Sequence, residues 1–97
     1  MRPLGVAFMD IDFLIAHLPP TIPQRHVEKL VRLVFRAAGV TGAWAVTLLP
    51  SDRQSRWDLG INGPSGRQFE SFTAQDAGLP TEVAEHVRRL LGRPVRG

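Results

Sequence analysis

Residues 57–62, Trp-Asp-Leu-Gly-Ile-Asn, decide how the rest of this chain is arranged. Apolar and polar residues alternate along them, which predicts a β-strand with one buried face. The next four residues, Gly63-Pro64-Ser65-Gly66, combine glycines that tolerate positive φ with a proline whose φ is fixed, so the chain should reverse direction there. Residues 67–72, Arg-Gln-Phe-Glu-Ser-Phe, then return as a second strand. The sequence therefore predicts an antiparallel hairpin on which the flanking helices pack.

Three further elements are predicted on either side of the hairpin. Residues 43–49 alternate in the same way and should form a third strand. A helix is expected from about Thr21 to Ala38, because Thr21 and Gln24 have the spacing of a capping box and Gly39 is placed to end the helix. A last helix should run from about residue 80 to residue 91, with Gly92 as its stop.

This order predicts an α+β fold, with an antiparallel three-stranded sheet and two helices on one face (α-β-β-β-α). The residues expected to meet the helices are Trp44, Val46, Leu48, Trp57, Leu59, Ile61 and Phe69. The opposite face is expected to show Ala45, Thr47, Leu49, Asp58, Gly60, Asn62, Gln68, Glu70 and Phe72. That mixed face could be solvated, covered by the N-terminal residues or used by a second copy.

Residues 1–20 form an apolar N-terminal arm whose structure is ambiguous. The spacing of Ile11, Leu14, Ile15 and Leu18 fits a helix face, and a short helix over residues 10–17 is the preferred prediction. The alternation of Ile11, Phe13 and Ile15 fits a strand equally well. The predicted organisation is one domain over residues 1–97, with the arm at 1–20, an α-β-β-β-α core at 21–92 and a basic tail at 93–97.

The composition bounds the class of protein. The chain has 97 residues, 43% of them hydrophobic, which suits one globular domain. It has no cysteine, which excludes a disulfide scaffold and thiolate metal sites. Eleven of the twelve basic residues are Arg, an Arg-rich composition that resembles bacterial codon bias. The net charge is only +3. Asp10 and Asp12 interrupt the apolar arm, which argues against a signal peptide or membrane span and predicts a cytoplasmic location.

The arm carries the leading functional hypothesis. It holds more apolar surface than a small sheet with two helices needs, and exposed apolar surface marks association sites. The sequence predicts a small protein-interaction or assembly module without catalysis, which forms a homodimer or binds another protein. The residues predicted to mediate self-association are Phe8, Ile11, Phe13, Leu14, Ile15 and Leu18.

Two alternatives remain open. Arg25, Lys29, Arg32 and Arg36 form a basic stripe along the first long helix that could bind a nucleic-acid backbone, although such a stripe is more often a solvated helix face. The second alternative is a small enzyme or ligand-binding domain whose site forms between subunits from distant residues such as His17 or His86 and a carboxylate. No histidine has a zinc-site spacing, so no catalytic residue, metal ligand or cofactor is predicted.

Overall fold

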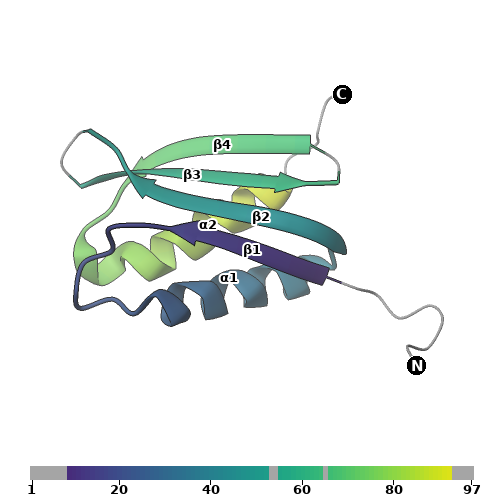
Figure 1. Ribbon diagram of the computed structural model, residues 1–97, viewed down its shortest axis with the longest axis horizontal. Coiled ribbons are helices and arrows are strands. Elements are labelled where there is room, and N and C mark those ends of the chain that lie inside the picture. Colours follow the sequence, from purple (N-terminus) through teal and green to yellow (C-terminus); the bar gives the residue numbers. More distant parts are fainter. Residues whose placement is uncertain (1–8, 53–54, 65, 93–97) are drawn as a thin grey trace.

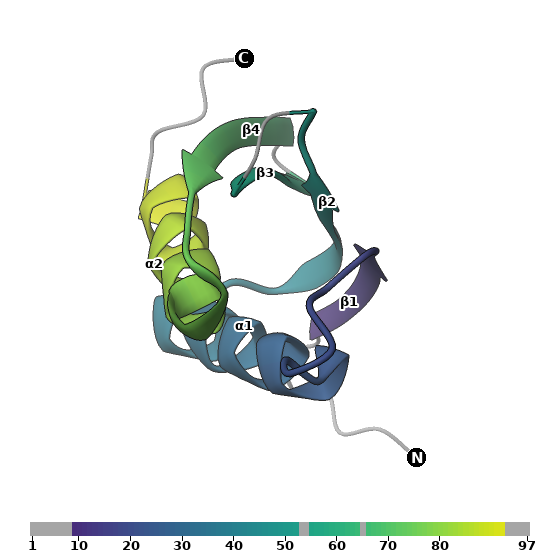
Figure 2. The ribbon, with the colours of Figure 1, turned by 90° about the vertical axis from the view of Figure 1, so that its left-hand side faces the viewer.

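The computed structural model of the protein describes residues 9–52, 55–64 and 66–92, which form one sheet and two α-helices (Figure 1). The elements follow in the order β1 (Met9–Ile15), α1 (Gln24–Ala38), β2 (Gly42–Pro50), β3 (Arg56–Gly63), β4 (Gly66–Thr73), a 3-10 turn over Asp76–Gly78, and α2 (Leu79–Gly92). The strands lie side by side in the order β1-β2-β3-β4. β1 is parallel to β2, whereas β3 is antiparallel to both β2 and β4. Both helices cover the same face of the sheet (Figure 2).

The predicted α+β class with two helices is confirmed, but the sheet differs in detail. It has four strands and is mixed, because the N-terminal arm contributes β1 and the order becomes β-α-β-β-β-α. The short helix preferred for residues 10–17 is therefore wrong, and the strand alternative is correct. Residues 9–15 pair along the whole of their length with β2, and that ladder supplies backbone hydrogen bonds that a short isolated helix could not match. The arm residues 1–8 lie outside the described part of the chain.

Helix α1 begins later than the capping-box prediction required. Its N-cap is Pro23, and no side chain caps the first turn. The side-chain Nε2 of Gln24 instead donates to Glu28 Oε2. Thr21 lies in the preceding turn, where the backbone N–H of Ile22 donates to the Pro19 carbonyl. At the other end Gly39 adopts φ 72°, the left-handed conformation expected of a helix-ending glycine.

The hairpin is confirmed, but the facing of β4 is the reverse of that predicted. Gly63 pairs with Gly66, so Ile61 lies opposite Gln68 and Trp57 opposite Phe72. Residues paired across an antiparallel ladder share a face. Phe72 therefore enters the core, and Phe69 points away from the helices. Gln68 and Glu70 lie on the helix side.

The core lies between the sheet and the two helices. Phe35 of α1 is fully buried there and meets the Trp44 ring of β2 edge to face, with ring centroids 5.2 Å apart. The Trp44 ring also lies across Gly63, where a Cβ atom would come within 2.3 Å of it. Within the described ranges, neither helix is long and apolar enough to cross a membrane. The buried apolar residues are Ile11, Ile22, Val27, Val31, Phe35, Val46, Leu48, Trp57, Leu59, Ile61, Phe72, Ala74, Leu79, Val83, Val87 and Leu90.

Candidate interaction surface

The face of the sheet that points away from α1 and α2 is covered by neither helix (Figure 2). We call it the open face. Because side chains alternate along a strand and paired residues share a face, its members follow from the register. They are Asp10, Asp12, Leu14, Ala43, Ala45, Thr47, Leu49, Arg56, Asp58, Gly60, Asn62, Arg67, Phe69, Ser71 and Thr73.

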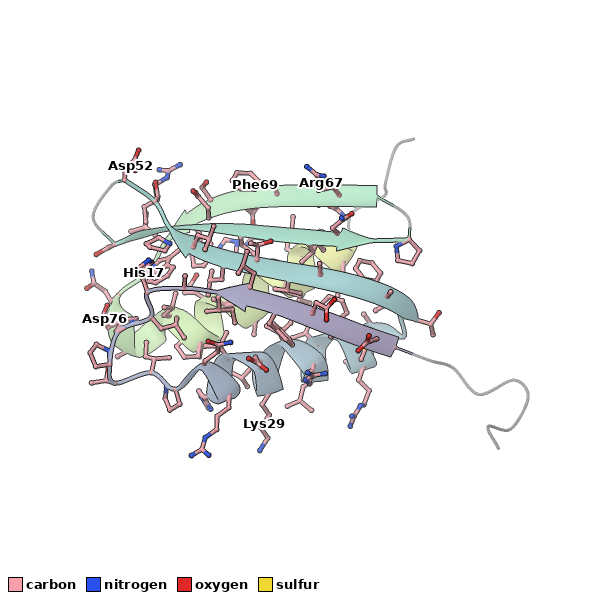
Figure 3. All side chains as sticks on the ribbon, in the orientation of Figure 1. His17, Lys29, Asp52, Arg67, Phe69 and Asp76 are labelled. Carbon is pink, nitrogen blue, oxygen red and sulfur yellow. The ribbon has the colours of Figure 1, made fainter. Side chains whose placement is uncertain are left out.

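The open face has a depression between two exposed apolar side chains. Leu14 on β1 is 61% exposed and Phe69 on β4 is 62% exposed, although both are large apolar side chains. Between them lies a hollow of about 350 Å³. Its floor is at Gly60, which has no side chain, and its walls include Thr47 and Phe69. The Phe69 ring and Arg67 project from β4, as Figure 3 shows.

Two rows of paired residues cross the open face. The first row runs from Leu14 through Thr47 and Gly60 to Phe69, so it is apolar at both ends and small in the middle. The second row runs from Asp12 through Ala45 and Asn62 to Arg67. The face is therefore acidic at the β1 edge and basic at the β4 edge.

A polar pair bounds the hollow at its far end. Asp58 and Ser71 lie opposite each other on β3 and β4, and Ser71 Oγ donates a hydrogen bond of 2.7 Å to Asp58 Oδ1. This bond ties the Asp58 carboxylate, which lines the hollow, to the neighbouring strand β4.

The structure separates the arm residues that the sequence predicted to mediate self-association. Ile11 is buried, and Phe13, Ile15 and Leu18 are partly buried against the core. Leu14 points the opposite way and reaches the open face. Phe8 lies outside the described residues. Much of the apolar surface that suggested an association arm thus completes the core of the chain itself.

The basic stripe lies on the helix side, away from the open face. Arg25, Lys29, Arg32 and Arg36 are all exposed on α1, and Lys29 points away from the sheet (Figure 3). The Arg32 guanidinium also lies 5.1 Å above the centre of the Phe13 ring. In the described part of the chain, no carboxylate forms an ion pair with any of the four.

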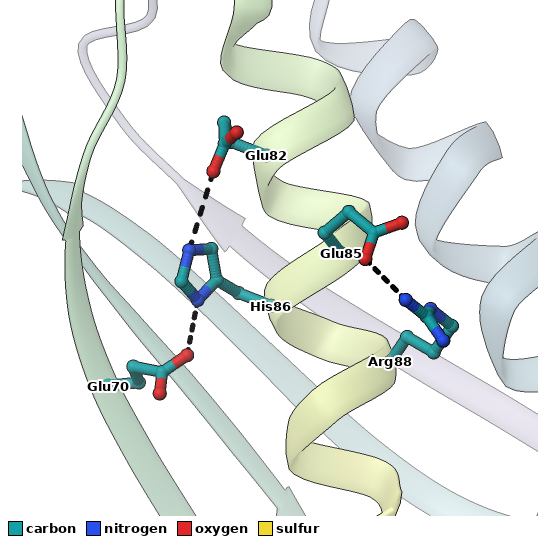
Figure 4. Close-up of polar contacts among 5 residues, drawn as sticks. All are labelled: Glu70, Glu82, Glu85, His86 and Arg88. Carbon is teal, nitrogen blue, oxygen red and sulfur yellow. Dashed lines mark hydrogen bonds and ion pairs between the residues drawn. The ribbon is translucent and has the colours of Figure 1, made fainter.

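His86 joins α2 to β4 (Figure 4). Its Nδ1 atom contacts Glu70 Oε2, its Nε2 atom lies 3.5 Å from Glu82 Oε2, and its ring stacks on Phe72 at 4.4 Å. Glu82 lies one turn before His86 on α2, so this contact is local, whereas Glu70 comes from β4, 16 positions earlier in the chain. The Glu70 contact was missed because β4 was given the wrong facing. Both ring nitrogens are engaged, so this cluster ties the last helix to the edge of the sheet.

The other residues of the inter-subunit hypothesis are not brought together. His17 follows β1 at one edge of the sheet, whereas His86 contacts β4 at the other. No group of three His, Asp or Glu side chains among the described residues could hold a metal ion. The exposed Glu85 accepts a hydrogen bond from Arg88, and this bond, together with the charge of Arg88, lowers the pKa of the Glu85 carboxyl (Figure 4).

Comparisons with known proteins found similarity among solved structures. No protein-family model matches the chain, and the search of curated proteins found no match. Among solved structures, the chain is similar to the Protein Y N-terminal domain of Thermus thermophilus, with 22% sequence identity and a TM-score of 0.46. The alignment covers 84% of this chain and 99% of that one.

Proposed function

We propose that this protein is a small assembly module without catalytic activity of its own, which self-associates through the open face. The observation that supports this proposal is the exposed apolar pair Leu14 and Phe69 on either side of the hollow. Large exposed apolar side chains gathered around a depression are typical of surfaces that bind another protein. The contact surface proposed here differs from that expected from the sequence, because most of the arm packs into the core.

The size of the open face limits how tightly it can bind. Four strands about 4.8 Å apart, with about seven residues each at about 3.3 Å per residue, give a flat area of roughly 400 Å². Stable interfaces bury about 800 Å² on each partner. The association is therefore expected to be weak, with a dissociation constant above about 10 µM.

Sedimentation velocity over a concentration series up to about 1 mM tests the proposal. The wild-type chain should pass from monomer to dimer within this range. Phe69→Ser should weaken the association at least about tenfold, since the change removes the largest exposed apolar side chain of the open face.

A matched control separates this face from general stickiness. Leu33 is an apolar residue of α1 that is 48% exposed on the helix side, so Leu33→Ser removes a similar exposed group elsewhere. The control should associate like the wild type. A wild-type chain that stays monomeric at 1 mM, or equal effects of the two substitutions, would contradict the proposal.

A second candidate function is binding of a nucleic-acid backbone by α1. It is favoured by the four exposed cations, which have no ion-pair partner among the described carboxylates. Four phosphate contacts predict a slope of about −3.6 in a plot of log affinity against log salt concentration. Binding of a generic duplex over a salt series tests this. Lys29→Ala should reduce the slope by about one, whereas Arg56→Ala, an exposed cation of the open face, should not change it.

A further inference from the structure

The open face is complementary to itself in shape and in charge, because it carries both a protruding Leu14 and a hollow, and both Asp12 and Arg67. We infer that Leu14 of a second copy occupies the hollow over Gly60, with the two copies related by a two-fold axis that runs along β2. This inference rests on the proposed self-association and adds the orientation of the partner and the residues that meet.

The strand order places Leu14 of β1 and the hollow over Gly60 of β3 symmetrically about β2. β1 lies one strand spacing to one side of β2, and β3 lies one spacing to the other. A rotation of 180° about an axis along β2 therefore places β1 of one copy over β3 of the other. Leu14 and Gly60 share one row with Thr47 of β2, so they meet without any shift along the strands.

The twist of the two sheets does not disturb this match. Packed sheets cross at about 30°, which at one strand spacing from the axis displaces a residue by only about 2 Å. On the axis itself lie Ala43, Ala45, Thr47 and Leu49. The first three have small side chains that allow the two sheets to approach closely, and the two copies of Leu49 meet each other at the end of the axis. The symmetry then buries both copies of Leu14 at once, each against Thr47, Gly60 and Phe69 of the other copy.

The charges of the neighbouring row agree with the same rotation. Asp12 is placed over Asn62 of the second copy, one strand spacing of about 4.8 Å from Arg67 of that copy. An arginine side chain spans this distance and binds a carboxylate well. Two such Asp12–Arg67 pairs form per dimer. A two-fold axis along the strands but between β2 and β3 would also pair these charges, so the charges support an axis along the strands, and the match of Leu14 with the hollow favours its position on β2.

Exchange of these charges between two variants tests the orientation. Asp12→Arg alone places Arg against Arg at both pairs, and Arg67→Asp alone places Asp against Asp. Each variant by itself should associate at least about tenfold more weakly than the wild type. An equimolar mixture should form a heterodimer within about threefold of the wild-type affinity, because both pairs are restored in it.

A mixture of Asp10→Arg with Arg67→Asp is the matched control, since Asp10 lies on the same strand and face but one row further from the row of Arg67. In this mixture Asp10→Arg keeps both Asp12–Arg67 pairs and should associate with itself like the wild type. Its heterodimer with Arg67→Asp keeps only one of the two pairs and should be at least about tenfold weaker than the charge-exchanged heterodimer. Urea unfolding of every variant checks that the monomer is intact. A charge-exchanged heterodimer no tighter than the dimers of its components, or a control heterodimer that is equally tight, would overturn the inference.

A second variant tests the hollow without any change of charge. The position of a Cβ atom at Gly60 is 3.5 Å from Thr47 Oγ1 and 3.9 Å from Phe69 Cδ2, which are ordinary contacts, and valine suits a strand. Gly60→Val should therefore fold and fill the floor of the hollow. We expect it to weaken association at least about tenfold even though it adds apolar surface.

Unchanged or tighter association of Gly60→Val would exclude Leu14 as the occupant of the hollow. The outcomes also separate this inference from the proposal on which it rests. Suppose that Phe69→Ser abolishes association, but the charge-exchanged mixture is not rescued and Gly60→Val associates like the wild type. The chain then self-associates in another orientation. If the wild type does not associate at all, self-association itself is wrong.

Discussion

Substitution of Gly63 by alanine should destabilise the protein through a single contact. The Trp44 ring lies directly over Gly63, so an added Cβ atom would be 2.3 Å from Trp44 Cε3 and 2.4 Å from Cζ3. Real Cβ atoms do not approach other atoms so closely, and the ring must move. The backbone of Gly63 is not in the left-handed region, so alanine adds no backbone strain there.

The expected cost follows from what holds the Trp44 ring. Its Nε1 atom donates a hydrogen bond of 2.9 Å to the Thr41 carbonyl, and the ring packs edge to face with Phe35. Loss of that hydrogen bond costs about 1 kcal/mol, and loss of the aromatic pair costs about another 1 kcal/mol. We therefore expect Gly63→Ala to lower the free energy of unfolding by about 2 kcal/mol, within the range for overpacked sites, and the melting temperature by about 8–16 °C.

Urea unfolding followed by tryptophan fluorescence measures this cost. Gly78→Ala is the control, because nothing lies within 4 Å of its added Cβ atom, and it should change the stability by less than about 0.5 kcal/mol. In a Trp44→Ala background the ring is gone, so Gly63→Ala should then cost almost nothing. If Gly63→Ala is as stable as the wild type, or costs the same with and without the ring, the reasoning is refuted.

Three further outcomes are expected. Phe35→Ala removes a fully buried ring and should cost about 3–5 kcal/mol in urea unfolding, and a cost below about 1 kcal/mol would contradict its place in the core. His86→Ala removes the ring stacked on Phe72 together with its carboxylate contacts and should cost about 1–3 kcal/mol, so an unchanged urea midpoint would show that α2 is held without it. The carboxyl of Glu85 should titrate by NMR below its ordinary pKa, and Arg88→Ala should raise that pKa. Because the pKa of Glu85 is lowered in the folded state, its contact with Arg88 stabilises the fold at neutral pH, and this stabilisation is lost as the pH falls through the folded-state pKa. A pKa of Glu85 that does not change in Arg88→Ala would contradict the cause given.

Local patterns were enough to predict most of the elements. The alternation at residues 43–49 and 57–62 defines β2 and β3, and Gly39 ends α1 as predicted. Each of these signals lies within one element or its cap, so no distant residue is needed to interpret it. The α+β class follows from their order.

The strand β1 could not be predicted in the same way. Residues 10–17 satisfy both a helical and a strand spacing, and the choice depends on a partner 33 positions later in the chain, since Met9 pairs with Gly42. Pairing with β2 selects the extended form. Local sequence carries no information about that partner, so tertiary structure overrides the preferred helix.

The facing of β4 was predictable but was missed. Residues 67–72 have one phenylalanine in each alternating set, so hydrophobicity alone does not choose between Phe69 and Phe72. Counting across the turn does choose, because a reversal centred between Pro64 and Ser65 places Ile61 opposite Gln68. The sequence predicted the face opposite the helices and its possible use by a second copy, but not the hollow, because the hollow depends on Phe69 pointing outward beside Gly60.

The parallel pairing of β1 with β2 has a consequence for the order of folding. β3 and β4 are joined by a tight turn and can form early, whereas β1 can join the sheet only after α1 has spanned the distance between them. We therefore expect β1 to open by local unfolding more readily than the β3–β4 hairpin. Since Leu14 belongs to β1, a second copy seated on it would clamp this strand, and each subunit would gain rigidity from its neighbour.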